Sequence, residues 1–174
     1  MIKYLVIDVD GTLTDGVVYI GNQGELCKGF FVKDGLGIKK IMEIGVCPVI
    51  LTARESEIVV QRCQELGIQQ IYQGVKDKKR ALQKIMAESY IRTDELAYIA
   101  DDLNDYEAMQ LAGLKACPAD AVTEIVEICD FVSDYNGGRG AVRQLCELIL
   151  GIYKNEQMIG LNSGIEDKNG EVNC

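Results

Sequence analysis

Three short apolar runs in this sequence each lead directly into acids or a hydroxyl, and this pattern restricts the possible folds more than any other feature. The runs are Tyr4 to Val9 (YLVIDV), Pro48 to Leu51 (PVIL) and Leu96 to Ala100 (LAYIA). Amphipathic stretches with helical periodicity separate them. Short apolar runs that alternate with such stretches are typical of a parallel sheet covered by helices. We therefore expect an α/β fold.

The rest of the chain predicts one domain and a tail. A β-hairpin is predicted from strands at Val17 to Ile20 and Cys27 to Val32 around a glycine-bounded turn. Residues 151–174 lose periodicity, so we expect a domain over 1–150 and a flexible tail over 151–174. Shorter strands are predicted at Ile71–Tyr72, Leu114–Cys117 and Phe131–Val132. Helices are predicted at about Gly35–Ile44 (with Asp34 as N-cap), Glu55–Leu66, Lys78–Glu88, Asp105–Ala112, Ala121–Ile128 and Ala141–Leu150.

The charge and the absence of histidine limit the chemistry. The chain has a net charge of −9, which argues against a nucleic-acid or anionic-membrane surface, since both need clustered Lys and Arg. It has no histidine among 174 residues. That removes Ser-His-Asp and Cys-His catalysis, histidine general bases and histidine metal sites. Acid–base or metal chemistry must therefore depend on carboxylates.

The cysteines indicate a reducing environment. There are seven, an odd number, with no CxxC pair and no zinc-like spacing. The opening MIKYLVIDVD has acids that interrupt the apolar run, so we expect no secretory signal. No segment approaches the length of a membrane span. We expect a cytoplasmic protein with free thiols.

Polar residues gather where the predicted strands end. Asp8 and Asp10 follow the first strand, and strand alternation would place them on the same side. In open α/β sheets ligands bind at the carboxyl ends of the strands. The remaining members of this set are Thr52 and Arg54 after the second strand, Asp101, Asp102 and Asp105 after LAYIA, and Lys78 at a helix start.

Several carboxylates without imidazole or thiolate ligands indicate a hard, oxygen-binding ion, and Mg²⁺ is the natural candidate. A threonine and a lysine beside Mg²⁺ indicate a phosphoryl group. Asp8 could then attack phosphorus, and Asp10 could protonate the leaving oxygen. A receiver-type phosphoacceptor module uses similar residues. It would need its acceptor aspartate after the strand PVIL, where this chain has Thr52.

The ordered motifs resemble the haloacid dehalogenase superfamily of phosphatases. They are DVDGT at 8–12, Leu51-Thr52, Lys78 and DDLND at 101–105. Further markers resemble its branch of 3-deoxy-D-manno-octulosonate 8-phosphate phosphatases and the phosphatase-like tail of acylneuraminate cytidylyltransferases. These markers are DVDGTLTDG, VKDGLGI, LTARES, GVKDK, YIADDLND and GGRGAVRQLCE. The resemblance covers about residues 1–150. It implies a Rossmann-like three-layer parallel sheet with no cap domain, a hairpin flap after the first strand, and a homotetramer.

The resemblance also implies roles for the acids. Asp8 matches the nucleophile and metal ligand, and Asp10 matches the general acid/base, which also gives its carbonyl oxygen to the Mg²⁺. Asp101 matches the third metal ligand. Asp102 and Asp105 are expected behind these ligands, where Asp105 would support Lys78 or a metal-bound water. Ala100 departs from the glycine that is usual in the family at this position.

Of the remaining residues, two are expected to hold the phosphate and the others have open roles. Thr52 and Lys78 match the phosphate-binding hydroxyl and lysine. Arg54, at the rim of the same loop, could bind a substrate carboxylate with two parallel hydrogen bonds, or could simply face solvent. Arg62 and the glycine-rich loop with Arg139 are left open between surface roles and contacts to substrate or a neighbouring subunit. Lys33, beside Asp34, could reach the site.

The expected function is Mg²⁺-dependent hydrolysis of a sugar-acid phosphate monoester, with 3-deoxy-D-manno-octulosonate 8-phosphate favoured. A nine-carbon ulosonate phosphate is the alternative substrate. A catalytically silent oligomerisation domain is the non-enzymatic alternative, and retention of every chemical group argues against it.

Overall fold

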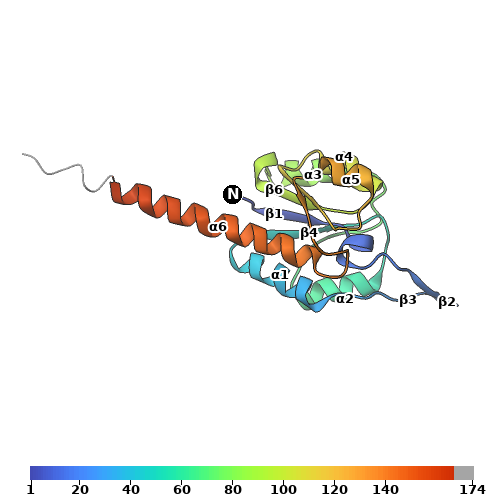
Figure 1. Cartoon of the computed structure of the whole chain (residues 1–174). Helices are drawn as coiled ribbons and strands as arrows, with labels where there is room; N and C mark the ends of the chain where they lie inside the picture. Colours follow the sequence, from blue (N-terminus) through green and yellow to red (C-terminus); the bar gives the residue numbers. More distant parts are fainter. Residues whose placement is uncertain (167–174) are drawn as a thin grey trace, which may run out of the picture.

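Six parallel strands form the central sheet, in the order β5-β4-β1-β6-β7-β8. The computed structural model describes residues 1–166, of which 159–166 are described by their backbone alone. The first strand along the chain, β1, lies at the centre between β4 and β6 (Figure 1). The strands are β1 (Tyr4–Ile7), β4 (Cys47–Leu51), β5 (Gln70–Tyr72), β6 (Leu96–Ile99), β7 (Leu114–Cys117) and β8 (Phe131–Val132).

Helices cover both faces of the sheet, which confirms the predicted three-layer α/β architecture (Figure 1). One apolar cluster packs α1, α2 and α6 against the sheet, and a second packs α3, α4 and α5 against the opposite face. The helices are α1 (Val32–Glu43), α2 (Glu57–Leu66), α3 (Lys78–Glu88), α4 (Tyr106–Met109), α5 (Thr123–Ile128) and α6 (Ala141–Glu166).

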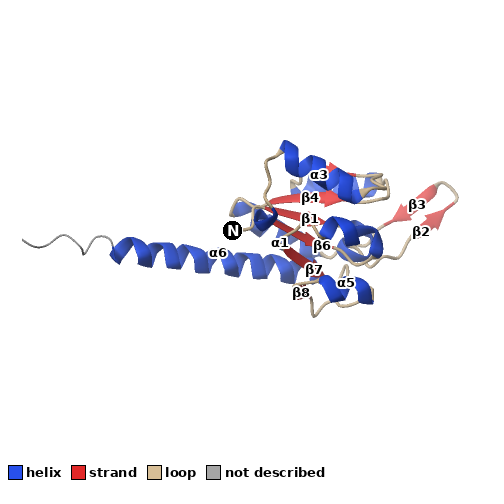
Figure 2. Ribbon diagram, turned by 90° about the horizontal axis from the view of Figure 1, so that it is seen from above, coloured by secondary structure: helices blue, strands red, loops and turns tan. Residues whose placement is uncertain are grey.

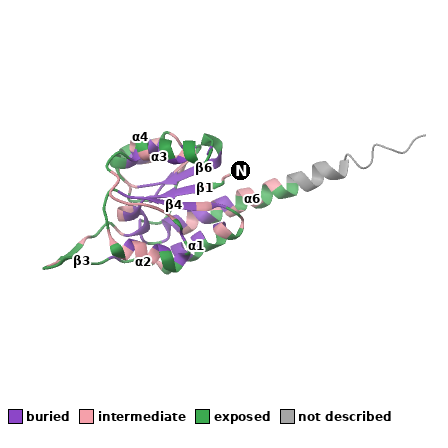
Figure 3. Ribbon diagram, turned by 180° about the vertical axis from the view of Figure 1, so that it is seen from behind, coloured by how far each residue is buried: buried purple, intermediate pink, exposed green. Residues whose placement is uncertain are grey.

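The alternation of side chains along β1 explains why the central strand is apolar throughout. Leu5 and Ile7 join the cluster under α1 and α6, whereas Val6 joins the cluster under α3. All three are fully buried. A strand that is covered on both faces cannot alternate apolar with polar residues, so it appears in the sequence as a continuous apolar run. Figure 3 shows this buried sheet between more exposed helices.

The segment of the chain between β1 and α1 forms an antiparallel ribbon of two strands, which projects from the domain (Figure 2). Its strands are β2 (Tyr19–Gly21) and β3 (Gly24–Cys27), so the second strand lies earlier than the predicted Cys27 to Val32. The turn is tighter than expected because Gly21 pairs with Gly24, which has a φ of 109°. The chain after Cys27 returns to the domain instead of extending the ribbon.

The start of α1 corrects a second prediction. The helix begins at Val32, so Asp34 lies in its first turn and is not its N-cap. The Asp34 carboxylate instead accepts a hydrogen bond from the backbone N–H of Arg143, at 2.8 Å, in the first turn of α6. Asp34 therefore caps another helix, more than a hundred residues away in the sequence.

Two further helices differ from prediction by three or more residues at one end. α4 covers only Tyr106–Met109: a separate 3₁₀ turn occupies Leu103–Asp105, and the helix ends three residues before the predicted Ala112. The last helix does not stop at Leu150 but continues to Glu166, so residues 151–166 are helical (Figure 1). The remainder of the predicted tail, 167–174, lies outside the described residues. Within residues 1–166, no helix combines the length and the hydropathy needed to cross a membrane.

Candidate active site

The predicted site residues meet at the carboxyl edge of the three central strands. Asp8 follows β1, Thr52 follows β4 and Asp101 follows β6, and these strands are neighbours in the sheet. β1 ends at Ile7 and the chain turns at Val9–Leu13, so strand alternation does not relate Asp8 to Asp10. Their carboxylates bind different cations, described below.

Lys78, the first residue of α3, is the centre of a buried ionic network. Its Nζ lies 2.6 Å from Asp8 Oδ1 and 2.8 and 2.7 Å from the two carboxylate oxygens of Asp105. The Tyr98 hydroxyl donates a further hydrogen bond to Asp105 Oδ1, at 2.5 Å. Asp105 therefore contacts Lys78, one of the two groups that it was predicted to support. The role of Tyr98 was not predicted, because Tyr98 lies within an apolar strand and nothing in the sequence distinguishes it from a core residue.

Burial and charge act in opposite directions in this network. Burial, reinforced by the charge of Asp105, raises the pKa of Asp8 to about 8, although Lys78 opposes the shift. Burial would lower the pKa of Lys78, but the charges of Asp8 and Asp105 outweigh it and raise that pKa. Lys78 thus remains an ammonium group. Asp8 needs more positive charge nearby to be a carboxylate at neutral pH.

Asp101 is held by the loop that follows β1. The Thr12 hydroxyl donates to Asp101 Oδ1 at 2.9 Å. Gly11 has a φ of 95°, and a Cβ built on it would lie 2.0 Å from Asp101 Oδ2. Only glycine therefore leaves room for the carboxylate. Burial raises the pKa of Asp101 to about 6, although the Thr12 hydrogen bond opposes the shift.

The donor set at this edge fits Mg²⁺. Asp8 is a buried carboxylate and Asp101 a half-buried one, so their negative charge is poorly solvated, and the main-chain carbonyl of Asp10 lies in the intervening turn. Within residues 1–158, whose side chains are described, no group of three or more acidic or cysteine side chains is placed to hold a metal ion by itself. Mg²⁺ in phosphoryl-transfer sites uses one or two carboxylates and completes its coordination with water and substrate phosphate. These residues could hold the ion in that way.

Asp10 faces the ribbon, and this contact was not predicted. Its Oδ1 is paired with Lys28 Nζ, and its Oδ2 lies 3.8 Å from Arg54 Nε. Glu25 of β3 contacts the same two cations and also accepts a hydrogen bond from the Ser56 hydroxyl. No periodicity or motif spacing in the sequence marks these ribbon residues, because their placement depends on how the ribbon turns back.

Thr52 and Asp102 occupy different environments. Thr52 is buried, and its Oγ1 accepts a hydrogen bond from the backbone N–H of Arg54 at 3.4 Å. Asp102 is exposed, and its carboxylate accepts from the backbone N–H of Leu103 at 2.7 Å. Asp102 therefore caps the 3₁₀ turn that leads to Asp105.

The glycine-rich loop at 137–140 packs against the turn that follows β1. A Cβ on Gly137 would lie 1.8 Å from the carbonyl oxygen of Gly11, and the Gly138 N–H donates to Thr12 O at 3.0 Å. Its glycines allow close contact with the turn after β1. Arg139 is paired with Asp15 at 3.1 Å, and Arg62 with Glu65 at 2.7 Å.

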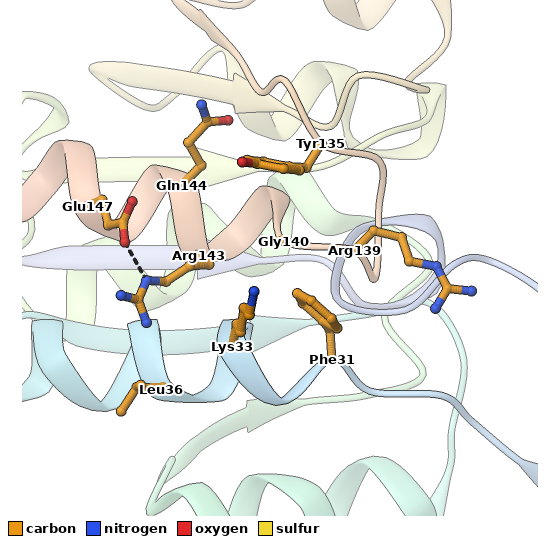
Figure 4. Close-up of a pocket in the computed structure, with 9 residues that line it drawn as sticks. All are labelled: Phe31, Lys33, Leu36, Tyr135, Arg139, Gly140, Arg143, Gln144 and Glu147. Carbon is orange, nitrogen blue, oxygen red and sulfur yellow. Dashed lines mark hydrogen bonds and ion pairs between the residues drawn. The ribbon is translucent and has the colours of Figure 1, made fainter.

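A pocket of about 460 Å³ lies apart from the acids, between the first turns of α1 and α6 (Figure 4). Lys33 points into it beside the Phe31 ring, with Nζ 5.7 Å from the ring centroid, so Lys33 does not extend toward the sheet edge. Arg143 on its wall is paired with Glu147 at 2.7 Å. The pocket shares no residue with the acid cluster.

Comparisons with known proteins identify the class. Residues 67–145 match the haloacid dehalogenase-like hydrolases, the class that this sheet and its acidic edge define. Over 149 residues the chain is 40% identical to the 3-deoxy-D-manno-octulosonate 8-phosphate phosphatase of Escherichia coli K12. The matched region covers 86% of this chain and 79% of that protein. The chain belongs to this phosphatase family, and the resemblance inferred from its motifs is confirmed.

Solved structures agree. The Moraxella catarrhalis phosphatase of the same name, in complex with a magnesium ion, a phosphate ion and a KDO molecule, superimposes with a TM-score of 0.85. It is 37% identical, and 92% of each chain is covered. The Yersinia pestis phosphatase has a TM-score of 0.83 and 40% identity, with 86% of this chain and 80% of that chain covered. A cobalt-bound form from Haemophilus influenzae has a TM-score of 0.83, 36% identity, and coverage of 86% and 88%.

Proposed function

We propose that the chain is a Mg²⁺-dependent phosphatase that hydrolyses 3-deoxy-D-manno-octulosonate 8-phosphate through an aspartyl-phosphate. The observation that carries this proposal is the contact of buried Lys78 with one oxygen of Asp8 at the central sheet edge. With Lys78 on Oδ1, we assign the attack on phosphorus to Oδ2. The names of the relatives favour the eight-carbon substrate over the nine-carbon alternative and over a silent oligomerisation domain.

In the first half-reaction, Asp8 Oδ2 forms a bond to phosphorus while the bond from phosphorus to the sugar oxygen breaks. Asp10 gives a proton to that leaving oxygen. When bound, Mg²⁺ neutralises charge on the phosphoryl oxygens. Lys78 and the Thr52 hydroxyl bind the same oxygens. In the second half-reaction, Asp10 accepts a proton from water as the water oxygen attacks phosphorus and the bond to Asp8 breaks.

Arg54 is proposed to bind the carboxylate of the sugar acid. It lies at the rim of the site, and its side chain is 47% exposed. Its contacts to Asp10 and Glu25, at 3.8 and 3.7 Å, keep the guanidinium beside the reacting groups. The phosphate is already matched by Lys78 and Thr52, and Lys28 is buried between Asp10 and Glu25, so the exposed guanidinium of Arg54 is the cation we assign to the other end of the substrate.

A homotetramer in the cytoplasm completes the proposal. Ile20 and Leu26 on the ribbon are 73% and 66% exposed, which is more apolar surface than a lone ribbon should leave in water. Phe30 and Phe31, in contrast, are partly buried within the domain. Packing of ribbons between subunits would cover Ile20 and Leu26. Free thiols on the six described cysteines suit a reducing compartment. Light scattering should give about four times the 19.2 kDa chain mass.

The function is tested by phosphate release from a panel of sugar and ulosonate phosphates, with Mg²⁺ and with excess chelator. We expect the octulosonate 8-phosphate to have the highest kcat/KM, and chelator to abolish turnover. Ca²⁺ should substitute poorly, because its longer bonds and higher coordination number misalign an in-line attack. Strong activity in excess chelator, or none on any ulosonate phosphate, would contradict the proposal.

A further inference from the structure

Glu25 of the ribbon lies between two cations of the active site. Its Oε1 is 3.0 Å from Lys28 Nζ and 3.7 Å from Arg54 Nη2. Its Oε2 accepts the hydroxyl hydrogen of Ser56, which precedes α2. One carboxylate thus connects the ribbon, the loop after β4 and the start of α2.

The two cations bound by Glu25 also flank Asp10. Lys28 contacts one carboxylate oxygen of Asp10, and Arg54 lies beside the other. Two carboxylates (Asp10 and Glu25) and two cations (Lys28 and Arg54) therefore alternate around the rim of the site. The Lys28 side chain is 1% exposed, so its place in this arrangement is fixed, whereas Arg54 is half exposed.

Oε1 of Glu25 is buried, yet it accepts no hydrogen bond of normal geometry. Its charge is balanced by the two neighbouring cations. The hydrogen bond from Ser56 and the charges of Lys28 and Arg54 outweigh the effect of burial and lower the pKa of Glu25, so the group is a carboxylate at neutral pH.

The orientation of Arg54 follows from these contacts. Asp10 and Glu25 lie beside Nε and Nη2, which form one edge of the guanidinium. The edge formed by Nη1 and Nη2 still carries two parallel N–H donors, the arrangement that binds a carboxylate through two hydrogen bonds. An exposed arginine without such anchors would lose rotamer entropy when it bound the substrate.

We propose that Glu25 is a positioning residue, which holds the guanidinium of Arg54 in the orientation that binds the substrate carboxylate. This inference rests on the proposed function and assigns the ribbon a part in substrate specificity. Glu25 itself contacts neither phosphate nor the reacting atoms. Its removal should therefore affect substrates with a carboxylate and spare those without one.

The test compares Glu25→Gln with wild type on octulosonate 8-phosphate and on p-nitrophenyl phosphate, which has no carboxylate. We expect KM for the sugar acid to rise about three- to tenfold, the cost of ordering one long side chain. Turnover of the aryl phosphate should stay within about twofold. Glu25→Asp, which keeps the charge, should recover part of the loss. Glu57→Gln is the matched control, because Glu57 is exposed on the first turn of α2.

A double-mutant cycle decides whether Glu25 acts through Arg54. In an Arg54→Ala background, Glu25→Gln should change KM for the sugar acid by less than about twofold. Additive losses, or equal losses on both substrates, would overturn the inference while leaving the phosphatase assignment intact. Absence of wild-type activity on any ulosonate phosphate would instead overturn the proposed function, and it would be seen before any variant is compared.

Discussion

Lys78 and Lys28 are both almost fully buried, and each bridges two acids, yet their surroundings differ. The partners of Lys78 are Asp8 and Asp105, whose side chains are 6% and 0% exposed. The partners of Lys28 are Asp10 and Glu25, at 19% and 16%. The first network is built from strand ends and a helix start, whereas the second joins Asp10, in the turn after β1, to the projecting ribbon. A fully buried network can thus hold the nucleophile, while a partly exposed one positions the proposed general acid and the cation proposed for the substrate carboxylate.

The largest effect on activity should come from the network of Lys78, Asp8 and Asp105, here called the sheet-edge network. Asp8→Asn should reduce phosphate release at least about a thousandfold on every substrate, because an amide cannot form the aspartyl-phosphate. The fold should persist, since Asn still offers an oxygen to Lys78. Phosphate release by the purified variant, with circular dichroism as a check of folding, measures this. Activity near wild type would exclude Asp8 as the nucleophile.

The two lysines can be compared directly by stability. Lys78→Met should lower the free energy of unfolding by about 3–5 kcal/mol, because it leaves Asp8 and Asp105 buried without their cation. Lys28→Met should cost less, about 2–3 kcal/mol, because Asp10 and Glu25 are partly exposed and both keep Arg54 as a neighbouring cation. Urea denaturation of the metal-free proteins gives both values.

Equal losses for the two variants would show that the ribbon network is as much a part of the framework as the sheet edge. A loss confined to Lys28→Met would reverse the comparison. The ribbon would then be the element that stabilises the domain.

The same division separates what the sequence could predict from what it could not. The strand ends were predictable because apolar runs in a doubly covered sheet are continuous and stop at the edge where ligands bind. Asp8, Thr52 and Asp101 each follow such a run directly. Their catalytic roles remain predictions.

Contacts that depend on three-dimensional folding gave no local signal. Lys28 reaches Asp10 only because the ribbon turns at Gly21–Gly24. The same turn makes the second strand begin at Gly24, earlier than predicted. Asp34 satisfies the usual pattern for an N-cap, but the hydrogen bond that its carboxylate accepts comes from a backbone N–H of α6. The end of α6 was missed because Gly and Asn lower helix propensity without preventing a helix.

Arg54 tests the specificity assigned to the rim. Arg54→Ala should weaken kcat/KM for octulosonate 8-phosphate by about 1.5–3 kcal/mol, the value of a charged hydrogen bond. Hydrolysis of p-nitrophenyl phosphate should barely change. Steady-state kinetics on both substrates separate the two cases. Parallel losses would place Arg54 on the phosphate or in the fold, and the rim would no longer be distinct from the chemistry.

The smallest effect should come from Tyr98, at the back of the sheet-edge network. Burial and the charge of Asp105 raise the pKa of Tyr98 well above its usual value, so the hydroxyl keeps its proton and donates to Asp105. Tyr98→Phe removes that donor but leaves Lys78 in contact with both oxygens of Asp105. We expect a loss of about 1–2 kcal/mol in unfolding free energy. Tyr106→Phe, in the same apolar cluster, is the matched control. If the two variants denature at the same urea concentration, Lys78 alone satisfies Asp105, and the sheet-edge network ends at that pair.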